Sequence, residues 1–92
     1  MHSPEPFQPP IEVTVRLFAA AREAAGADAL TIGARNGMDL VVELESHTEE
    51  LRTTLPRCSF LVAGTSHRFD QLPTVALEPG LTIDVLPPFA GG

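Results

Sequence analysis

The chain has 92 residues, a formal net charge of -6, 43% apolar residues and 20% charged ones. That length suits one domain, and the apolar share is large enough to build a core, which excludes global disorder. All six basic residues are arginines scattered along the sequence, which excludes the clustered positive surface that binds nucleic acid.

Three features of the sequence indicate the cellular setting. Cys58 is the only cysteine, so no internal disulfide can form and a reducing, cytoplasmic environment is expected. Residues 1–10 contain four prolines but neither segment of a secretory signal, and we expect them to be a flexible leader. No apolar run approaches the roughly 18 residues that span a membrane, so we expect a soluble protein.

The first part of the domain is predicted to contain two strands and a helix. Residues 11–17 alternate between apolar and polar side chains, which is typical of a half-buried β-strand. Residues 19–26 are rich in alanine and end in glycine, which predicts a short helix. Residues 28–33 indicate a second strand, and the pair Asn36-Gly37 indicates a turn.

The middle of the chain is predicted to form two consecutive helices. From Met38 the apolar residues recur at intervals of three and four, so a helix is expected to begin near Asp39 as its N-cap. Thr48 is followed by two glutamates, a pattern that favours a second helix start. Pro56 is expected to end that segment.

The last third of the domain returns to strands. Residues 58–64 predict a mostly buried strand, and residues 66–69 a short strand that pairs back onto it. Residues 70–80 are expected to be a loop that ends in a Glu-Pro-Gly type II turn, and residues 81–86 the final strand. The fold class is therefore α+β, a mixed sheet of four to five strands packed on one main helix plus short helices.

The chain beyond residue 86 is expected to leave the sheet. Pro87 and Pro88 have no N–H, so pairing with a neighbouring strand must stop at or near Leu86. Their rings also stiffen the exit into an extended path. The four residues that follow could reach roughly 14 Å from the sheet, so residues 11–86 are predicted as the domain and residues 87–92 as an extended tail.

No group of side chains in the sequence forms a recognisable active site. His2, His47 and His67 are not at the spacing of metal ligands, so no metal is expected. Cys58 has no cysteine or histidine partner nearby and is expected to be a buried, inert thiol. The remaining chemical group is the terminal carboxylate behind Gly91 and Gly92, which is anionic at neutral pH and able to attack the α-phosphorus of ATP.

Two motifs resemble a known family. The ending "LPPFAGG" is similar to that of the small subunit of molybdopterin synthase, a sulfur carrier with the ubiquitin-like β-grasp fold. The predicted order of strands is also that of a β-grasp, and the resemblance covers about residues 11–92. A second motif of the family, FAxxRExxG, is matched by Phe18, Ala19, Arg22, Glu23 and Gly26.

The resemblance implies a cycle in which this chain carries sulfur. An adenylyltransferase of the ubiquitin-activating type would consume ATP to adenylate Gly92, and a persulfide donor would convert the adenylate to a thiocarboxylate. The tail would then enter the large synthase subunit and donate sulfur to cyclic pyranopterin monophosphate, forming molybdopterin. The family suggests two large and two small subunits, with no permanently bound cofactor and no catalytic side chain in the small subunit.

The same resemblance assigns roles to individual residues. Gly92 would be the attachment point of sulfur, with Pro87 and Pro88 as the rigid exit. The residues that would fit the partner's channel are Phe89, Ala90 and Gly91. The candidates for the partner interface are Phe18, Arg22, Asp84 and Leu86. Phe18 and Leu86 could equally belong to the core, and Arg22 could either brace the tail or simply lie on the helix surface.

Several other functions fit the same sequence. A sulfur carrier for thiamine or cysteine synthesis would share the fold and the glycine pair, although the Pro87-Pro88 pair favours the molybdopterin branch. A protein modifier would conjugate Gly92 to lysines of other proteins. A β-grasp interaction domain would make no use of its last residues.

Overall fold

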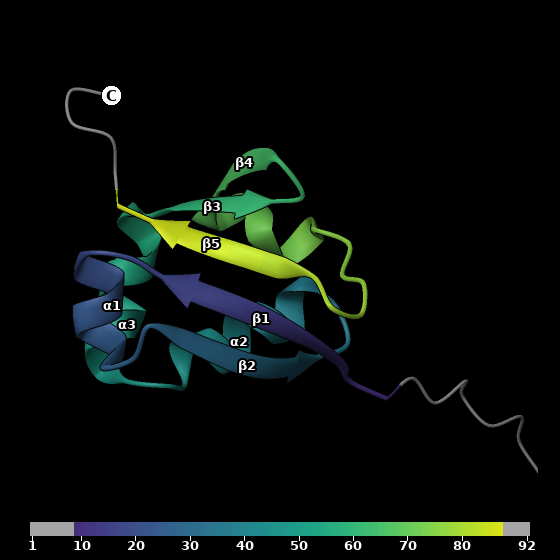
Figure 1. The fold of residues 1–92 in the computed structure, drawn as a ribbon, viewed down its shortest axis with the longest axis horizontal. Helices are drawn as coiled ribbons and strands as arrows, with labels where there is room; N and C mark the ends of the chain where they lie inside the picture. Colours follow the sequence, from purple (N-terminus) through teal and green to yellow (C-terminus); the bar gives the residue numbers. More distant parts are fainter. Residues whose placement is uncertain (1–8, 88–92) are drawn as a thin grey trace, which may run out of the picture.

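Five strands form one mixed sheet in the computed structural model, which describes residues 9–87 (Figure 1). The strands are β1 (Ile11–Leu17), β2 (Ala29–Ala34), β3 (Ser59–Val62), β4 (Thr65–Arg68) and β5 (Thr82–Leu86). Their order across the sheet is β2-β1-β5-β3-β4. β1 and β5 run parallel, and the other neighbours run antiparallel. The predicted α+β class with a mixed sheet is confirmed.

The helices cover one face of this sheet (Figure 1). They are α1 (Ala20–Ala25), α2 (Gly37–Glu45) and α3 (Glu49–Thr54), with the 3-10 helices η1 (Leu55–Arg57) and η2 (Phe69–Thr74). The sheet therefore has one face toward the helices and one face toward solvent.

No helix in the part of the chain that the structure describes is long and apolar enough to cross a membrane.

The core lies between the sheet and the helices. The sheet contributes Val13, Val15, Leu17, Ile32, Ala34, Phe60, Val62, Ile83 and Val85, all buried. The helical layer contributes Ala21, Ala25, Leu40, Val41, Leu44, Leu51, Leu55 and Leu72. The alternation predicted for residues 11–17 is confirmed, because every second residue from Val13 to Leu17 is buried while Glu12 and Arg16 are exposed.

Helix α2 begins earlier than the sequence pattern predicted. Asn36 is the N-cap, and its side-chain oxygen accepts a hydrogen bond from the Asp39 N–H at 2.9 Å. The prediction of Asp39 as N-cap is therefore wrong, because Asn36 is an equally good capping residue three positions earlier. The pair Asn36-Gly37 starts the helix rather than a turn. Asp39 lies in the first turn of α2 instead.

The predicted start and end of the second helical segment are confirmed, whereas the predicted start of the loop that follows β4 is wrong. Thr48 caps α3 by accepting the Leu51 N–H at 2.9 Å, as predicted. Pro56 lies in η1, directly after α3 ends. The loop predicted over residues 70–80 is wrong at its start, because η2 occupies residues 69–74. The Gln71 side chain accepts the Arg68 N–H at 2.8 Å and so stabilises the first turn of η2.

The predicted turn before β5 is confirmed. The Leu81 N–H donates to the Glu78 carbonyl at 3.1 Å, and Gly80 has φ of 81°. This is the conformation that a type II turn requires at its second central position, where glycine is favoured. The turn directs the chain into β5, beside β1.

Gly37 is required for α2 to approach η2 closely. A Cβ atom on Gly37 would clash with the carbonyl oxygen of Leu72 and lie 2.8 Å from the carbonyl atoms of Pro73. Both neighbours are backbone atoms, which cannot rotate away as a flexible side chain could.

We expect Gly37→Ala to lower the free energy of unfolding by about 2 kcal/mol, since the added methyl forces α2 and η2 apart. Urea denaturation of the purified chain measures this difference. Met38→Ala is the control, because Met38 is the next residue in α2 and is 55% exposed. A Gly37→Ala variant as stable as Met38→Ala would show that the contact is not tight.

Candidate functional site

The candidate site is the surface around the end of β5. Pairing stops at Leu86, which lies opposite Ser59, and Pro87 follows outside the strand. The predicted end of pairing at Leu86 is confirmed, since Pro87 has no N–H to continue the ladder. The rest of the predicted tail lies outside the described residues, so its roles remain predictions. Those residues are Pro88, Phe89, Ala90, Gly91 and Gly92.

Phe18 lies beside this exit because β1 and β5 are parallel and end at the same edge. The Phe18 N–H donates to the Val85 carbonyl at 3.2 Å. The Phe18 side chain is 38% exposed, whereas that of Leu86 is partly buried. Phe18 is thus not a core residue, and its ring is accessible at the place where the chain leaves the sheet.

Arg16 and Asp84 form an ion pair next to the exit. They lie opposite each other in the parallel register of β1 and β5. The Arg16 guanidinium donates two hydrogen bonds to the Asp84 carboxylate, at 2.7 Å and 2.8 Å. The guanidinium carbon also lies 5.7 Å from the centre of the Phe18 ring, within the range of a cation–π interaction. Asp84 therefore offers a partner an ion pair rather than a free carboxylate.

This ion pair changes the acidity of both groups. The hydrogen bond from Arg16, with its positive charge, holds the pKa of the Asp84 carboxyl below its ordinary value, although partial burial acts in the opposite direction. The hydrogen bond to Asp84 raises the pKa of Arg16. Asp84 is thus ionised throughout the neutral range.

Leu61 completes this surface, although no sequence motif pointed to it. It lies opposite Asp84 in the antiparallel register of β3 and β5, and it is partly buried. Alternate residues of a strand face the same side, so Leu61 shares the solvent-facing side of the sheet with Arg16 and Asp84. We call the group formed by Arg16, Phe18, Leu61, Asp84 and Leu86 the exit surface.

Arg22 is separate from the exit surface. It is exposed on α1, and its Nε lies 3.8 Å from the Asp28 carboxylate. The structure thus places Arg22 on the helix surface, in contact with the loop before β2. A contact with the tail would involve residues outside the described part of the chain.

The turn between Phe18 and α1 has a strained residue that sequence patterns did not reveal. Ala19 has φ of 54° and ψ of -125°, a conformation that glycine adopts far more readily than alanine. The Ala21 N–H donates to the Phe18 carbonyl at 3.1 Å, which closes the turn. The alanines after Phe18 predicted only helix, so no local signal marked this strain. Ala19 thus forms the turn that connects Phe18 to α1.

The remaining reactive groups do not add chemistry to this surface. Cys58 is buried, as predicted, and its thiol donates to the Thr54 carbonyl at 3.4 Å. Burial raises the pKa of the Cys58 thiol, which favours the less reactive protonated form. Within residues 9–87, no three His, Cys, Asp or Glu side chains are grouped so that they could hold a metal ion.

Comparison with known proteins extends this description. No protein-family model matches the sequence, and no curated protein matches it either. Solved structures do match. Small archaeal modifier protein 1 of Methanosarcina acetivorans is 26% identical, with a TM-score of 0.75 over 90% of this chain and 98% of that one. The chain has the ubiquitin-like β-grasp fold.

Two further β-grasp neighbours have lower identity and support the fold alone. A protein of Pyrococcus furiosus, provisionally assigned as molybdopterin converting factor subunit 1, is 24% identical with a TM-score of 0.69, over 86% of this chain and 99% of that one. Small archaeal modifier protein 1 of Haloferax volcanii is 20% identical with a TM-score of 0.70, over 88% and 99%. Both neighbours therefore agree with the β-grasp fold of this chain.

We expect Ala19→Gly to raise the free energy of unfolding by about 1 kcal/mol, because glycine relieves the strain at positive φ. Ala20→Gly, one residue later and inside α1, is the matched control and should lower it by roughly 0.5–1 kcal/mol. Thermal or urea denaturation measures both. If the two substitutions destabilise the β-grasp domain equally, Ala19 is not strained.

We expect part of the acid sensitivity of the domain to come from Asp84. Because its pKa is lower in the folded chain, its ionisation stabilises the fold above the ordinary value of 3.8, and this contribution is lost as the pH falls through the lowered pKa. Asp84→Asn should therefore lose less stability between pH 6 and about pH 2 than the native chain does. Urea titrations at several pH values measure this loss.

Asp28→Asn is the control for that series, since Asp28 is 87% exposed and lies 3.8 Å from its arginine partner. It removes an exposed carboxylate without breaking a close hydrogen bond, so comparison of the two variants isolates the effect of the Arg16–Asp84 pair. Identical acid profiles for Asp84→Asn and the native chain would contradict the assignment.

Proposed function

We propose that this chain is a sulfur carrier for molybdenum cofactor synthesis. The observation that carries the proposal is the position of β5: it lies in the middle of the sheet, ends at Leu86 beside an exposed Phe18, and is followed by a proline that prevents further pairing. The sequence that continues from this point ends in Gly91-Gly92. Glycine lets a chain pass through a narrow channel because it has no side chain.

The proposed chemistry takes place on the carboxylate of Gly92. The carboxylate attacks the α-phosphorus of ATP, which releases pyrophosphate and leaves an acyl-adenylate. The terminal sulfur of a persulfide displaces AMP and forms an acyl disulfide. A second thiol then cleaves the sulfur–sulfur bond, leaving a thiocarboxylate on Gly92 and a disulfide on the donor. ATP is used by the activating enzyme, so the chain itself needs no bound cofactor.

The neighbours support this class of function. One is assigned as a subunit of molybdopterin converting factor, and such a subunit implies a large partner subunit. We propose that the large subunit receives Phe89, Ala90 and Gly91 in a channel and holds cyclic pyranopterin monophosphate at its end. The assembly would contain two large and two small subunits and would lie in the cytoplasm.

We propose that the activating enzyme and the large synthase subunit both dock on the exit surface. Phe18, Leu61 and Leu86 offer apolar contact around the Arg16–Asp84 ion pair, which lies close to the place where the chain leaves the sheet. Apolar and aromatic side chains at the centre of such a surface supply most of the binding energy in protein complexes. Arg22, on the neighbouring helix, would contact a partner at the margin of this surface.

A protein modifier is the second candidate function, and one observation favours it. The neighbour of 26% identity is named as a small archaeal modifier protein. The two functions share the adenylate of Gly92 and differ in the group that displaces AMP. A persulfide gives a thiocarboxylate, whereas a lysine amine of another protein gives an isopeptide bond.

We expect the intact mass of the chain to rise by the exchange of one oxygen for sulfur after incubation with a ubiquitin-activating-type enzyme, MgATP and a persulfide donor. Mass spectrometry of the intact protein and of its C-terminal peptide would place the change at Gly92. Addition of the large synthase subunit and cyclic pyranopterin monophosphate should return the original mass and produce molybdopterin.

The chain without Gly92 is the control and should stay unmodified with the same enzymes. A mixture without ATP should also give no product. Absence of both adenylate and thiocarboxylate would contradict the sulfur-carrier proposal. A thiocarboxylate that the large subunit cannot use would assign the chain to another sulfur pathway, and conjugates with lysine-containing proteins would assign it to the modifiers.

A further inference from the structure

Strand β2 forms one edge of the sheet and has backbone groups that no other strand uses. In an antiparallel pair, alternate residues turn their N–H and C=O toward the neighbour and the others turn them away. The hydrogen bond from the Leu17 N–H to the Asp28 carbonyl, at 2.8 Å, fixes this alternation between β1 and β2. The residues of β2 that turn these groups away from β1 are Ala29, Thr31 and Gly33. Within residues 9–87 these groups make no hydrogen bond to another segment.

This edge lacks the features that usually prevent strand pairing. Edge strands in native proteins commonly carry charged residues, a proline or a bulge. The sequence of β2 is ALTIGA, without a charge or a proline, and its register with β1 is continuous from Ala29 to Ala34. The edge is therefore able to accept a further strand.

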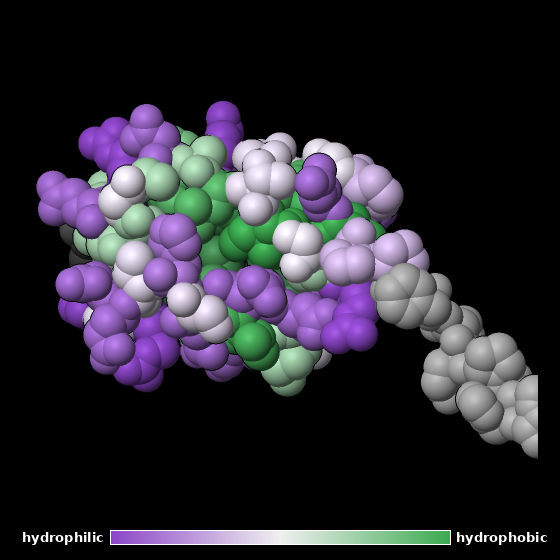
Figure 2. Space-filling model, turned by 90° about the horizontal axis from the view of Figure 1, so that it is seen from below, coloured by the Kyte–Doolittle hydropathy of each residue, from purple (hydrophilic) through white to green (hydrophobic). Residues whose placement is uncertain are grey.

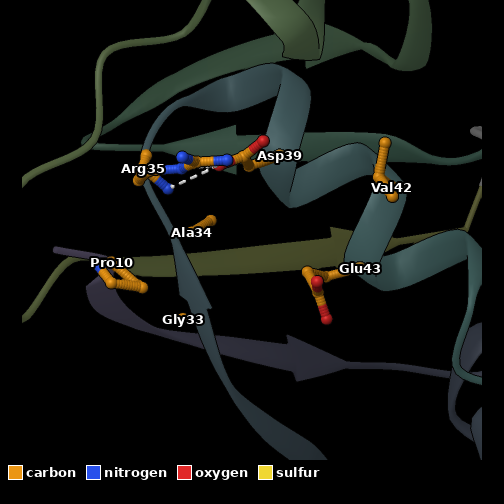
Figure 3. Close-up of a pocket in the computed structure, with 7 residues that line it drawn as sticks. All are labelled: Pro10, Gly33, Ala34, Arg35, Asp39, Val42 and Glu43. Carbon is orange, nitrogen blue, oxygen red and sulfur yellow. Dashed lines mark hydrogen bonds and ion pairs between the residues drawn. The ribbon is translucent and has the colours of Figure 1, made fainter. Parts of the chain in front are cut away.

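A groove runs between this edge and helix α2. It holds a hollow of about 420 Å³ lined by Pro10, Gly33, Ala34, Arg35, Asp39, Val42 and Glu43 (Figure 3). Val42 is 50% exposed, although it is a large apolar residue. Figure 2 looks onto the β2 side of the molecule and shows apolar residues along the middle of that face with polar residues around them. We call the β2 edge and this hollow together the β2 groove.

The charge on the rim of the β2 groove is negative. The Arg35 guanidinium donates to the Asp39 carboxylate at 2.8 Å, so these two charges offset each other. Glu43 makes no ion pair within the described residues and extends from α2 at the rim of the hollow (Figure 3). A ligand with a lysine or arginine therefore complements this rim better than an acidic one.

We propose that the β2 groove binds an extended peptide segment of another protein, which adds to β2 as a sixth strand. Its backbone pairs with Ala29, Thr31 and Gly33, and its alternate side chains are apolar and enter the hollow. A lysine or arginine of the segment pairs with Glu43. Strand addition of this kind takes affinity from backbone hydrogen bonds and specificity from pockets for alternate side chains.

A second copy of this chain fits the groove less well. Each copy has a net charge of -6, and the arginine that lines the groove, Arg35, is already paired with Asp39. Edge-to-edge pairing of two copies would bring together two molecules of the same net negative charge, which opposes association. A basic and apolar segment from another protein has no such repulsion.

The β2 groove and the exit surface lie at opposite ends of β1. Ile11 pairs with Ala34 at the groove, and Phe18 follows the other end of β1 beside Val85. Six steps along a strand separate these ends by about 20 Å. A peptide in the groove leaves the exit surface free, so this inference does not rest on the sulfur-carrier proposal.

The test uses the full, isotope-labelled chain and an octapeptide with four central valine and isoleucine residues and two lysines at each end. We expect saturable binding by NMR, with slower amide hydrogen exchange at Ala29, Thr31 and Gly33 in the complex. The amides that already pair with β1 should change far less. A peptide with glutamates in place of the lysines should bind at least tenfold more weakly.

Two pairs of variants separate the backbone contact from the charge contact. Thr31→Pro removes the outward N–H and should weaken binding at least tenfold, whereas Thr31→Val keeps that N–H and should bind normally. Glu43→Arg should reverse the preference to the glutamate-flanked peptide. Glu50→Arg makes the same charge change on α3 and should leave the preference unchanged.

Several results would overturn the proposal. Binding that leaves the exchange of Ala29, Thr31 and Gly33 unchanged would exclude strand addition, and so would equal affinities of folded Thr31→Pro and Thr31→Val. Lack of binding at millimolar peptide would also reject it. Sedimentation showing a dimer that Thr31→Pro disrupts would assign the groove to a second copy instead.

Discussion

The parallel pairing of β1 with β5 is the contact on which the rest of the molecule depends. It joins strands from opposite ends of the chain in the middle of the sheet, and Arg16 and Asp84 bridge it although they are 68 positions apart. Because parallel strands end at the same edge, the residue after β1 comes to lie beside the residue after β5. The exit surface exists only because of this pairing.

The two faces of the sheet have different roles, because successive side chains of each strand point to opposite faces. Val13, Val15 and Ile83 face the helices and are almost fully buried, so their role is packing. Arg16, Leu61 and Asp84 face solvent, where loss of a contact changes the core little. A surface of this kind is able to acquire affinity for partners without disturbing the fold that supports it.

The sequence predicted most of the elements because their signals are local. The alternation in residues 11–17 reports directly which side chains face the core, and Thr48 and the Glu78–Gly80 turn act through contacts within a few residues. The start of α2 was missed although its signal is local, because Asn36 and Asp39 are both good capping residues and the pattern does not choose between them. The strain at Ala19 is also local, but alanine carries no turn signal. Only the contact of Gly37 with Leu72 and Pro73 joins distant segments, and it leaves no trace in a window of neighbouring residues.

The candidate site was predictable only in outline for the same reason. The prolines after Leu86 marked where pairing ends, and the motif around Phe18 marked the other strand. That Asp84 is paired with Arg16, and that Leu61 lies next to it, depends on strand order, which no single stretch of sequence encodes. The motifs therefore indicated where the site lies, whereas the pairing register of β1, β5 and β3 determines which residues form it.

Because β5 lies in the centre of the sheet, the exit surface can form only after β5 has been synthesised and has paired with β1. Pairing of β1 with β5 closes a loop of more than sixty residues, and such non-local contacts form slowly. During synthesis β1 is made before β5, so the pair can form only after the residues between them have been made. An activating enzyme that requires the exit surface would thus distinguish domains in which β1 and β5 have paired from domains in which they have not.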